Sequence, residues 1–163
     1  MYGTFWSPRN ADVFASVSAD HFLKIWDAKA PRSVQTIKAH DFDILAMDWN
    51  KYQEGMIVTG SVDRSMKVWD LRFPGRELKV LHGHSQAVRK LKCSPHLGNI
   101  VASTSYDLTT RVWDIDRMEP AIFKYSHPEF VTGVDFNLYI EGQIASCSWD
   151  SVTHIFRVPQ IFK

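Results

Sequence analysis

Serine, histidine and aspartate occur together at three places in this sequence of 163 residues, and such a set could form a nucleophilic triad. The sets are His40, Ser61 and Asp63, then His84, Ser105 and Asp107, then His127, Ser148 and Asp150. An enzyme needs one such site, whereas a repeated architecture needs one set in each repeat. The repetition favours a structural role for these residues, and we expect no enzyme activity.

The spacing of the tryptophans defines the repeat. Trp26, Trp69 and Trp113 are 43 and 44 residues apart, and one further step of 43 reaches Phe156. Each aspartate of the three sets lies 6 residues before Trp69, Trp113 or Phe156, and each histidine of the sets lies 29 residues before the same residue. A period of about 40 to 45 residues with Gly-His and Trp-Asp signatures is typical of a β-propeller blade of four strands.

The fold class that follows is all-β: a WD-repeat β-propeller of about four blades of antiparallel four-stranded sheet, forming an open part of a seven-bladed ring. Residues 1–163 are predicted to form a single partial propeller, with blades at approximately 1–39, 40–82, 83–126 and 127–163. In the second blade, strands are expected at residues 44–49, 56–60, 66–69 and 78–81, where β-branched and aromatic residues alternate with polar ones. The first blade lacks its start, and the last lacks its outer strand.

The repeated polar residues resemble the structural network of WD-repeat proteins. The resemblance implies a buried chain of hydrogen bonds from the tryptophan of the third strand, through a hydroxyl of the second strand and the histidine, to the aspartate of the turn. The sequence leaves open whether the hydroxyl belongs to Ser61 or Thr59, and to Ser105 or Ser103. Since Phe156 replaces tryptophan in the fourth repeat, its network should be incomplete and its blade the least stable.

Composition excludes several classes of function. Nineteen basic and 18 acidic residues give a net charge of +1, so we expect no nucleic-acid partner. No apolar segment has the roughly 18 residues of a membrane span, so no direct membrane insertion is expected. The two cysteines and the histidines outside the repeated sets, His21, His82, His96 and His154, show no ligand spacing, so neither a metal nor a cofactor is predicted.

Binding is expected on one face of the disc, where WD-repeat proteins present the residue before the turn aspartate and the residues that follow the histidine. The candidates for peptide binding are Asp41, Asp43, Val62, Tyr106, Glu129, Phe130 and Trp149. Aromatic side chains beside acidic groups would suit a peptide with an apolar face and a basic residue. The alternative is that the aromatic side chains pack on neighbouring loops.

Longer segments carry a more specific resemblance. DWNKYQEGMIVTGSVDRSMKVWDLR (48–72), SPHLGNIVASTSYDLTTRVWDI (94–115), and EFVTGVDF followed by ASCSWDS (129–151) resemble the family of peroxisomal targeting signal 2 receptors. The match covers nearly the whole chain and corresponds to the last four blades of that family. It implies a receptor without catalysis that binds cargo proteins through an N-terminal type 2 peroxisomal targeting signal, together with an import co-receptor. It also implies shuttling between cytoplasm and peroxisomal matrix.

Two expectations accompany this interpretation. Because the family has a full ring of blades, we expect the chain to be a truncated form, and its four blades to leave two apolar faces open. The alternative function is a generic WD-repeat scaffold for protein interactions in another complex.

Overall fold

The computed structural model describes residues 1–117 and 121–158, which form fifteen strands and no helix. The strands make four antiparallel sheets, each built from strands consecutive in the sequence. Sheet 1 contains β1 (Gly3–Trp6), β2 (Val13–Val17), β3 (Phe22–Asp27) and β4 (Ser33–Lys38). Sheet 2 contains β5 (Ile44–Trp49), β6 (Met56–Ser61), β7 (Met66–Asp70) and β8 (Lys79–Leu81). Sheet 3 contains β9 (Val88–Cys93), β10 (Ile100–Ser105), β11 (Thr109–Asp114) and β12 (Phe123–Ser126), and sheet 4 contains β13 (Val131–Phe136), β14 (Gln143–Ser148) and β15 (Thr153–Arg157).

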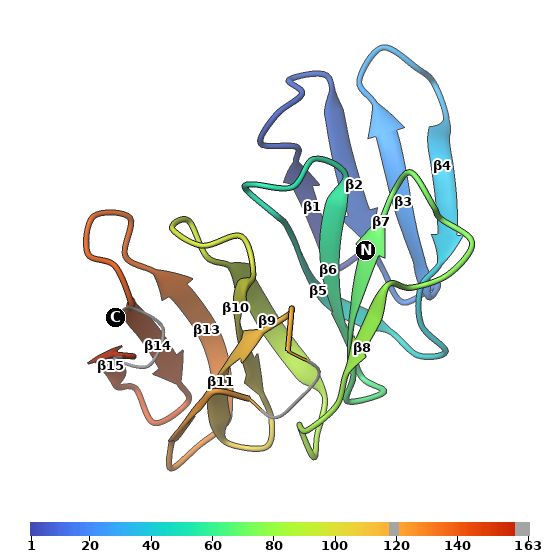
Figure 1. The fold of residues 1–163 in the computed structure, drawn as a ribbon. Helices are drawn as coiled ribbons and strands as arrows, with labels where there is room; N and C mark the ends of the chain where they lie inside the picture. The colour runs from blue at the N-terminus through green and yellow to red at the C-terminus, as the bar shows by residue number, and fades with distance from the viewer. Residues whose placement is uncertain (118–120, 159–163) are drawn as a thin grey trace.

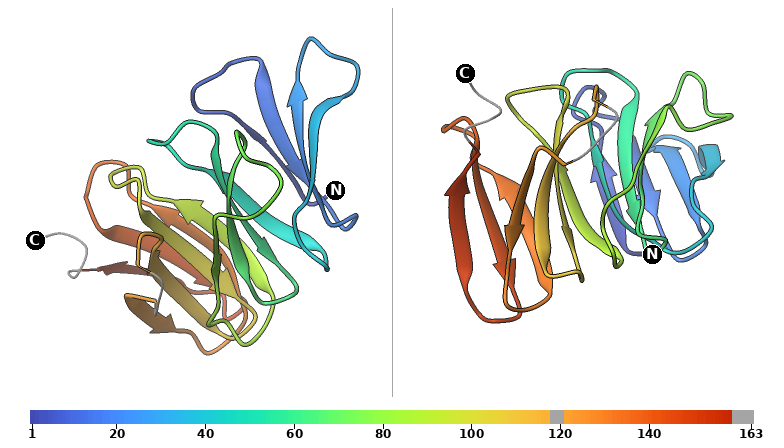
Figure 2. Two further views of the ribbon diagram at one scale, coloured as in Figure 1. Left: turned by 45° about the vertical axis from the view of Figure 1, so that its right-hand side comes forward. Right: turned by 60° about the horizontal axis from the view of Figure 1, so that its bottom comes forward.

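The sheets stand side by side in chain order, from sheet 1 at the upper right of Figure 1 to sheet 4 at the left. The first strands of neighbouring sheets, β1, β5, β9 and β13, contact one another in sequence along the inner side of this arc. Both views in Figure 2 show the same fan of sheets. The predicted fold class, an open partial β-propeller, is confirmed. Within the described residues, sheet 4 has three strands, and no helix could span a membrane.

Three apolar cores lie in the spaces between neighbouring sheets. Between sheets 1 and 2, Leu23 and Ile25 pack against Trp49 and Trp69. The second core joins sheets 2 and 3, and the third joins sheets 3 and 4. Each fully buried side chain of this size contributes about 1.5–3 kcal/mol relative to its exposed state, so contact between sheets is the main source of stability.

The two outer faces of the arc are open, as the sequence predicts. Trp6 is 62% exposed on sheet 1, whereas Trp49 at the corresponding position of sheet 2 is 4% exposed. On sheet 4, Ile155 is 68% exposed, whereas the corresponding Val112 of sheet 3 is fully buried. Positions that form cores inside the arc therefore meet solvent at its ends.

The turn between the second and third strands has the same geometry in all four sheets. The residue after the turn aspartate has a positive φ of 65–71° in each case: His21, Arg64, Leu108 and Ser151. One oxygen of each aspartate accepts a hydrogen bond from the backbone N–H two residues later, at 2.8–3.2 Å. This hydrogen bond between the aspartate side chain and the backbone stabilises the turn. The residue that it spans has a left-handed conformation, which few residue types favour.

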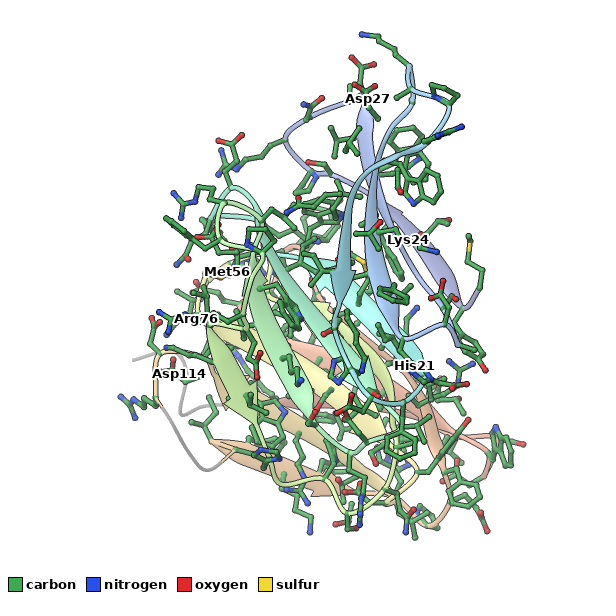
Figure 3. All side chains as sticks on the ribbon, turned by 90° about the vertical axis from the view of Figure 1, so that its right-hand side faces the viewer. His21, Lys24, Asp27, Met56, Arg76 and Asp114 are labelled. Carbon is green, nitrogen blue, oxygen red and sulfur yellow. The ribbon has the colours of Figure 1, made fainter. Side chains whose placement is uncertain are left out.

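These turns and the loops that carry the histidines lie at one edge of the sheets, which we call the turn face. Figure 3 shows this edge for sheet 1, with His21 at one end of the sheet, Asp27 at the other, and Lys24 between them. Since Ile44 pairs with Ser61 at the start of β5, the His40 loop and the Asp63 turn share the same edge. The turn face therefore brings together the predicted network and the predicted binding residues.

Candidate functional site

The hydrogen-bond chain of sheet 2 runs from the core to the turn face. Trp69 Nε1 donates to Thr59 Oγ1 (3.0 Å), which lies 2.8 Å from His40 Nε2. His40 Nδ1 in turn lies 2.7 Å from Asp63 Oδ2. Because an ionised carboxylate can only accept, the Nδ1–H of His40 donates to Asp63, and the Thr59 hydroxyl links the indole to the other ring nitrogen of His40.

Sheet 3 repeats this chain with serine in place of threonine. Trp113 Nε1 donates to Ser103 Oγ (2.8 Å), His84 Nε2 lies 2.7 Å from the same oxygen, and His84 Nδ1 lies 2.8 Å from Asp107 Oδ2. Thr59 and Ser103 are therefore the linking hydroxyls.

Ser61 and Ser105, named as network members in the sequence analysis, lie outside these chains. The Ser61 hydroxyl donates to the Phe42 carbonyl, and the Ser105 hydroxyl donates to the Gln86 carbonyl. Each also accepts the backbone N–H of the turn aspartate two residues later. Ser61 and Ser105 thus tie the histidine loop to the turn.

The charges in these chains suit a structural role. Burial would raise the pKa of Asp63, but hydrogen bonds from His40 and Ser65 outweigh it and lower the pKa to about 2. Asp107 shows the same balance and a lowered pKa. Burial also lowers the pKa of His84, against the opposing effect of Asp107. Each chain thus joins an ionised carboxylate, an imidazole and a hydroxyl that is fully buried, an arrangement without an exposed nucleophile.

Sheet 4 departs from this arrangement. His127 Nε2 contacts Ser146 Oγ (2.9 Å) and Thr110 Oγ1 (3.2 Å), so Ser146, and not Ser148, takes the linking position. Phe156 provides no indole donor, and among the described residues His127 Nδ1 has no hydrogen-bond partner. Asp150 keeps its bond to the Val152 N–H, but it does not bond to His127. The network of the fourth repeat is incomplete, in agreement with the sequence-based expectation.

On the turn face of sheets 2 to 4, the residue before the turn aspartate contacts the loop that follows the histidine. The backbone N–H groups of Val62, Tyr106 and Trp149 donate to the carbonyls of Asp43, Ala87 and Phe130, at 3.0–3.2 Å. Three of these side chains are exposed: Val62 (39%), Phe130 (37%) and Trp149 (64%). The candidate binding residues of sheets 2 to 4 therefore form an equivalent row along the turn face.

The aromatic candidates form one cluster. The rings of Tyr106 and Phe130 meet edge to face with centroids 5.2 Å apart, and those of Phe130 and Trp149 do so at 5.4 Å. With Gln86, these three rings line a pocket of about 540 Å³. The aromatic side chains thus pack on one another across sheets 3 and 4 and still present an apolar surface to solvent. Packing on neighbouring loops and an exposed binding surface, the two alternatives left open by the sequence, therefore occur together.

The acidic candidates are arranged differently. Asp41 is paired with Lys38 at 3.0 Å, and the hydrogen bond from Lys38 lowers the pKa of Asp41. Asp43 accepts a hydrogen bond from the Tyr2 hydroxyl at 2.9 Å. Glu129 is exposed and has no ion pair within residues 1–117 and 121–158. Glu129 is therefore an exposed acidic candidate without an ion pair among the described residues, adjacent to Phe130.

Three residues of this face were missed by the sequence reasoning: Tyr2, Phe42 and Gln86. Phe42 is 57% exposed and occupies the same loop position as Gln86 and Glu129, two residues after each histidine. That shared phase was the signal that could have identified Phe42 and Gln86. The contact between Tyr2 and Asp43 joins sheet 1 to sheet 2, and no repeated marker predicts it.

Comparison with known proteins identifies the relatives of the chain. The model of the WD domain, G-beta repeat, matches residues 31–70 and 75–114. The chain is 54% identical to the peroxisomal targeting signal 2 receptor of Dictyostelium discoideum, with 88% of this chain and 74% of that protein covered. It is 41% identical to the receptor of the same name from Mus musculus, with 96% and 77% covered. For the receptor of Saccharomyces cerevisiae, at 28% identity, 92% of this chain covers half of that protein.

Proposed function

The chain belongs to the peroxisomal targeting signal 2 receptor family of WD40-repeat proteins, and on that premise we propose that it binds cargo proteins carrying a type 2 peroxisomal targeting signal. The observation that carries the proposal is the pocket of Tyr106, Phe130 and Trp149 on the turn face. Exposed aromatic rings at positions with no folding requirement mark a binding surface.

The chemistry of this surface suits a short amphipathic helix. The apolar side of the helix would rest on the rings of Phe130 and Trp149, and a basic residue beside it would face Glu129. Val62 and Phe42 extend the apolar surface over sheet 2. Since Asp41 is paired with Lys38, it contributes less charge to this surface than Glu129.

The same proposal covers the wider role of the protein. It acts as a binding protein without a catalytic step, together with an import co-receptor, and shuttles between the cytoplasm and the peroxisomal matrix. The arrangement of the repeated Ser, His and Asp residues supports a role without a catalytic step, because their hydrogen bonds join strands, loops and turns.

The test is direct binding of a fluorescent peptide with a type 2 peroxisomal targeting signal, measured by anisotropy against a scrambled peptide of the same composition. Trp149→Ala should weaken binding about 30-fold, since truncation of a central aromatic costs about 2 kcal/mol. Trp6→Ala is the matched control, because Trp6 is equally exposed (62% against 64%) but lies on β1 at the open end of the arc.

Equal binding of the two peptides would reject the proposal and favour a scaffold for other partners. Preference for the signal peptide with no loss in the Trp149 variant would keep the function but remove the aromatic pocket as its site. Loss of binding in both variants would indicate a general effect on folding, which circular dichroism of each variant detects.

A further inference from the structure

Three ligand atoms converge in sheet 4 where the regular network is broken. His127 Nδ1, Asp150 Oδ2 and His154 Nε2 are buried and have no hydrogen-bond partner among the described residues. They lie within 4.8 Å of one another, and the Asp150 and His154 atoms are 4.0 Å apart. Buried polar groups are rarely left unpaired, so several of them at one place indicate that an ion or a proton compensates them.

The opposite atom of each side chain is already engaged. His154 Nδ1 lies 2.9 Å from the Tyr125 hydroxyl, His127 Nε2 lies 2.9 Å from Ser146 Oγ, and Asp150 Oδ1 accepts the Val152 N–H at 2.8 Å. Partners of this kind fix the ring orientation and tautomer of metal-binding histidines. Here they hold all three side chains with their free atoms within 4.8 Å of one another.

The missing bond to the turn aspartate explains why His127 can take this role. In sheets 2 and 3 the aspartate carboxylate can only accept, which places a ring proton of the histidine on Nδ1. In sheet 4 no such bond is made among the described residues, and the hydroxyls of Ser146 and Thr110 can accept from His127 Nε2–H. The lone pair of His127 then lies on Nδ1, the atom that faces Asp150 and His154.

We propose that His127, Asp150 and His154 form a binding site for a divalent transition-metal ion, with zinc as the preferred occupant. Two imidazole nitrogens and one carboxylate oxygen suit zinc and its neighbours better than magnesium or calcium. Zinc bonds of about 2.0–2.1 Å in tetrahedral geometry place ligand atoms about 3.3 Å apart, so side-chain movements of about 1 Å close the site. The fourth position remains for water.

Such an ion would fasten the outermost sheet to its neighbour. Tyr125 belongs to β12 of sheet 3, whereas His154 lies on β15 of sheet 4, and Asp150 directly follows Trp149. The site would thus stabilise the three-stranded sheet and the turn that presents Trp149. This inference stands independently of the proposed cargo.

The test uses the complete 163-residue chain, stripped of metal with a chelator and titrated with zinc chloride in a calorimeter. One zinc ion per chain should bind, and at 100-fold excess over Kd the unfolding midpoint should rise by about 5–10 °C. Cobalt in place of zinc should give the visible absorption of a tetrahedral nitrogen–oxygen site, a signature that a merely structural role of these residues would not produce.

Two variants separate the metal site from general effects. His154→Lys introduces the residue found at the same phase in sheet 1, where Lys24 pairs with Asp20 at 2.7 Å, so it should fold and lose the metal. Asp150→Asn retains the acceptor for Val152 and should lose most of the affinity. His82→Gln, at an exposed histidine outside the cluster, is the control and should bind as the parent chain does.

Absence of zinc binding by the parent chain would overturn the proposal. So would equal zinc binding, or an unchanged cobalt spectrum, in the two site variants. In that case a proton shared between Asp150 and His154 is the remaining explanation of the cluster.

Discussion

Removal of the Ser103 hydroxyl tests the proposed hydrogen-bond chain most directly. Ser103→Ala deletes one oxygen that serves both the Trp113 indole (2.8 Å) and His84 Nε2 (2.7 Å). All three residues are buried, with exposures of 0%, 2% and 7%. Each partner left unsatisfied costs about 1–3 kcal/mol, so the free energy of unfolding should fall by about 2–4 kcal/mol.

Ser146→Ala is the matched control, because it removes the same hydroxyl from the same strand position of sheet 4. Only His127 loses a bond there, and its Nε2 retains Thr110 Oγ1 at 3.2 Å. The expected loss is about 1 kcal/mol or less.

Urea unfolding followed by tryptophan fluorescence and circular dichroism measures both variants, with the midpoints compared at equal m-values. A cycle that combines Ser103→Ala with Trp113→Phe isolates the indole contribution, which should be about 1 kcal/mol of coupling. If Ser146→Ala costs as much as Ser103→Ala, or if Ser103→Ala costs less than 1 kcal/mol, the indole–hydroxyl–imidazole chain does not stabilise the fold as argued.

The remaining predictions concern a turn, the thiols and acid. Arg64→Gly should stabilise the chain by up to about 1 kcal/mol in urea unfolding, because Arg64 is exposed with φ of 71° and glycine removes the left-handed strain; a destabilised variant would refute this. Burial raises the pKa of the Cys93 thiol, whereas Cys147 lies half-buried on the open face of sheet 4. A thiol reagent at pH 8 should therefore modify Cys147 alone in the native chain and both cysteines in denaturant. The pKa of Asp63 is about 2 in the fold and about 4 when unfolded, so its contribution is complete above pH 4 and is lost as the pH falls toward 2. Asp63→Asn should reduce the dependence of unfolding free energy on pH in that window, and an unchanged dependence would count against the ionised Asp63–His40 pair.

The strands and the turn face were predictable because their causes are local. The alternation of apolar and polar residues assigns each strand residue to one face of the sheet, and the turn aspartate accepts a hydrogen bond from the backbone N–H two residues later. The expected range 44–49 coincides with β5. The expected ranges 56–60, 66–69 and 78–81 each differ from β6, β7 and β8 by one residue at one end.

The linking hydroxyl was not predictable, because Thr59 and Ser61 lie two residues apart on β6 and thus on the same side of the strand. Which of them reaches His40 depends on how the loop before β5 meets the sheet, where the register shifts between Ile44 and Ala46. That geometry is set by contacts between segments about 20 residues apart.

His154 shows a second limit of the repeat pattern. It shares its phase with Lys24, Lys67 and Arg111, which indicates a solvated strand face. In the structure its ring instead meets Tyr125 from the neighbouring sheet, 29 residues earlier. Partners of this kind arise from packing between sheets, and sequence spacing alone does not specify them.

The exposure of Trp6 and of Ile155 at opposite ends of the arc has a consequence for assembly. These surfaces correspond to the two halves of one kind of contact, since Trp49 and Val112 are buried at the same positions inside the chain. Two copies that joined through them would associate head to tail with a different patch from each partner. Growth of this kind ends only when curvature closes it into a ring, and otherwise it continues as a filament.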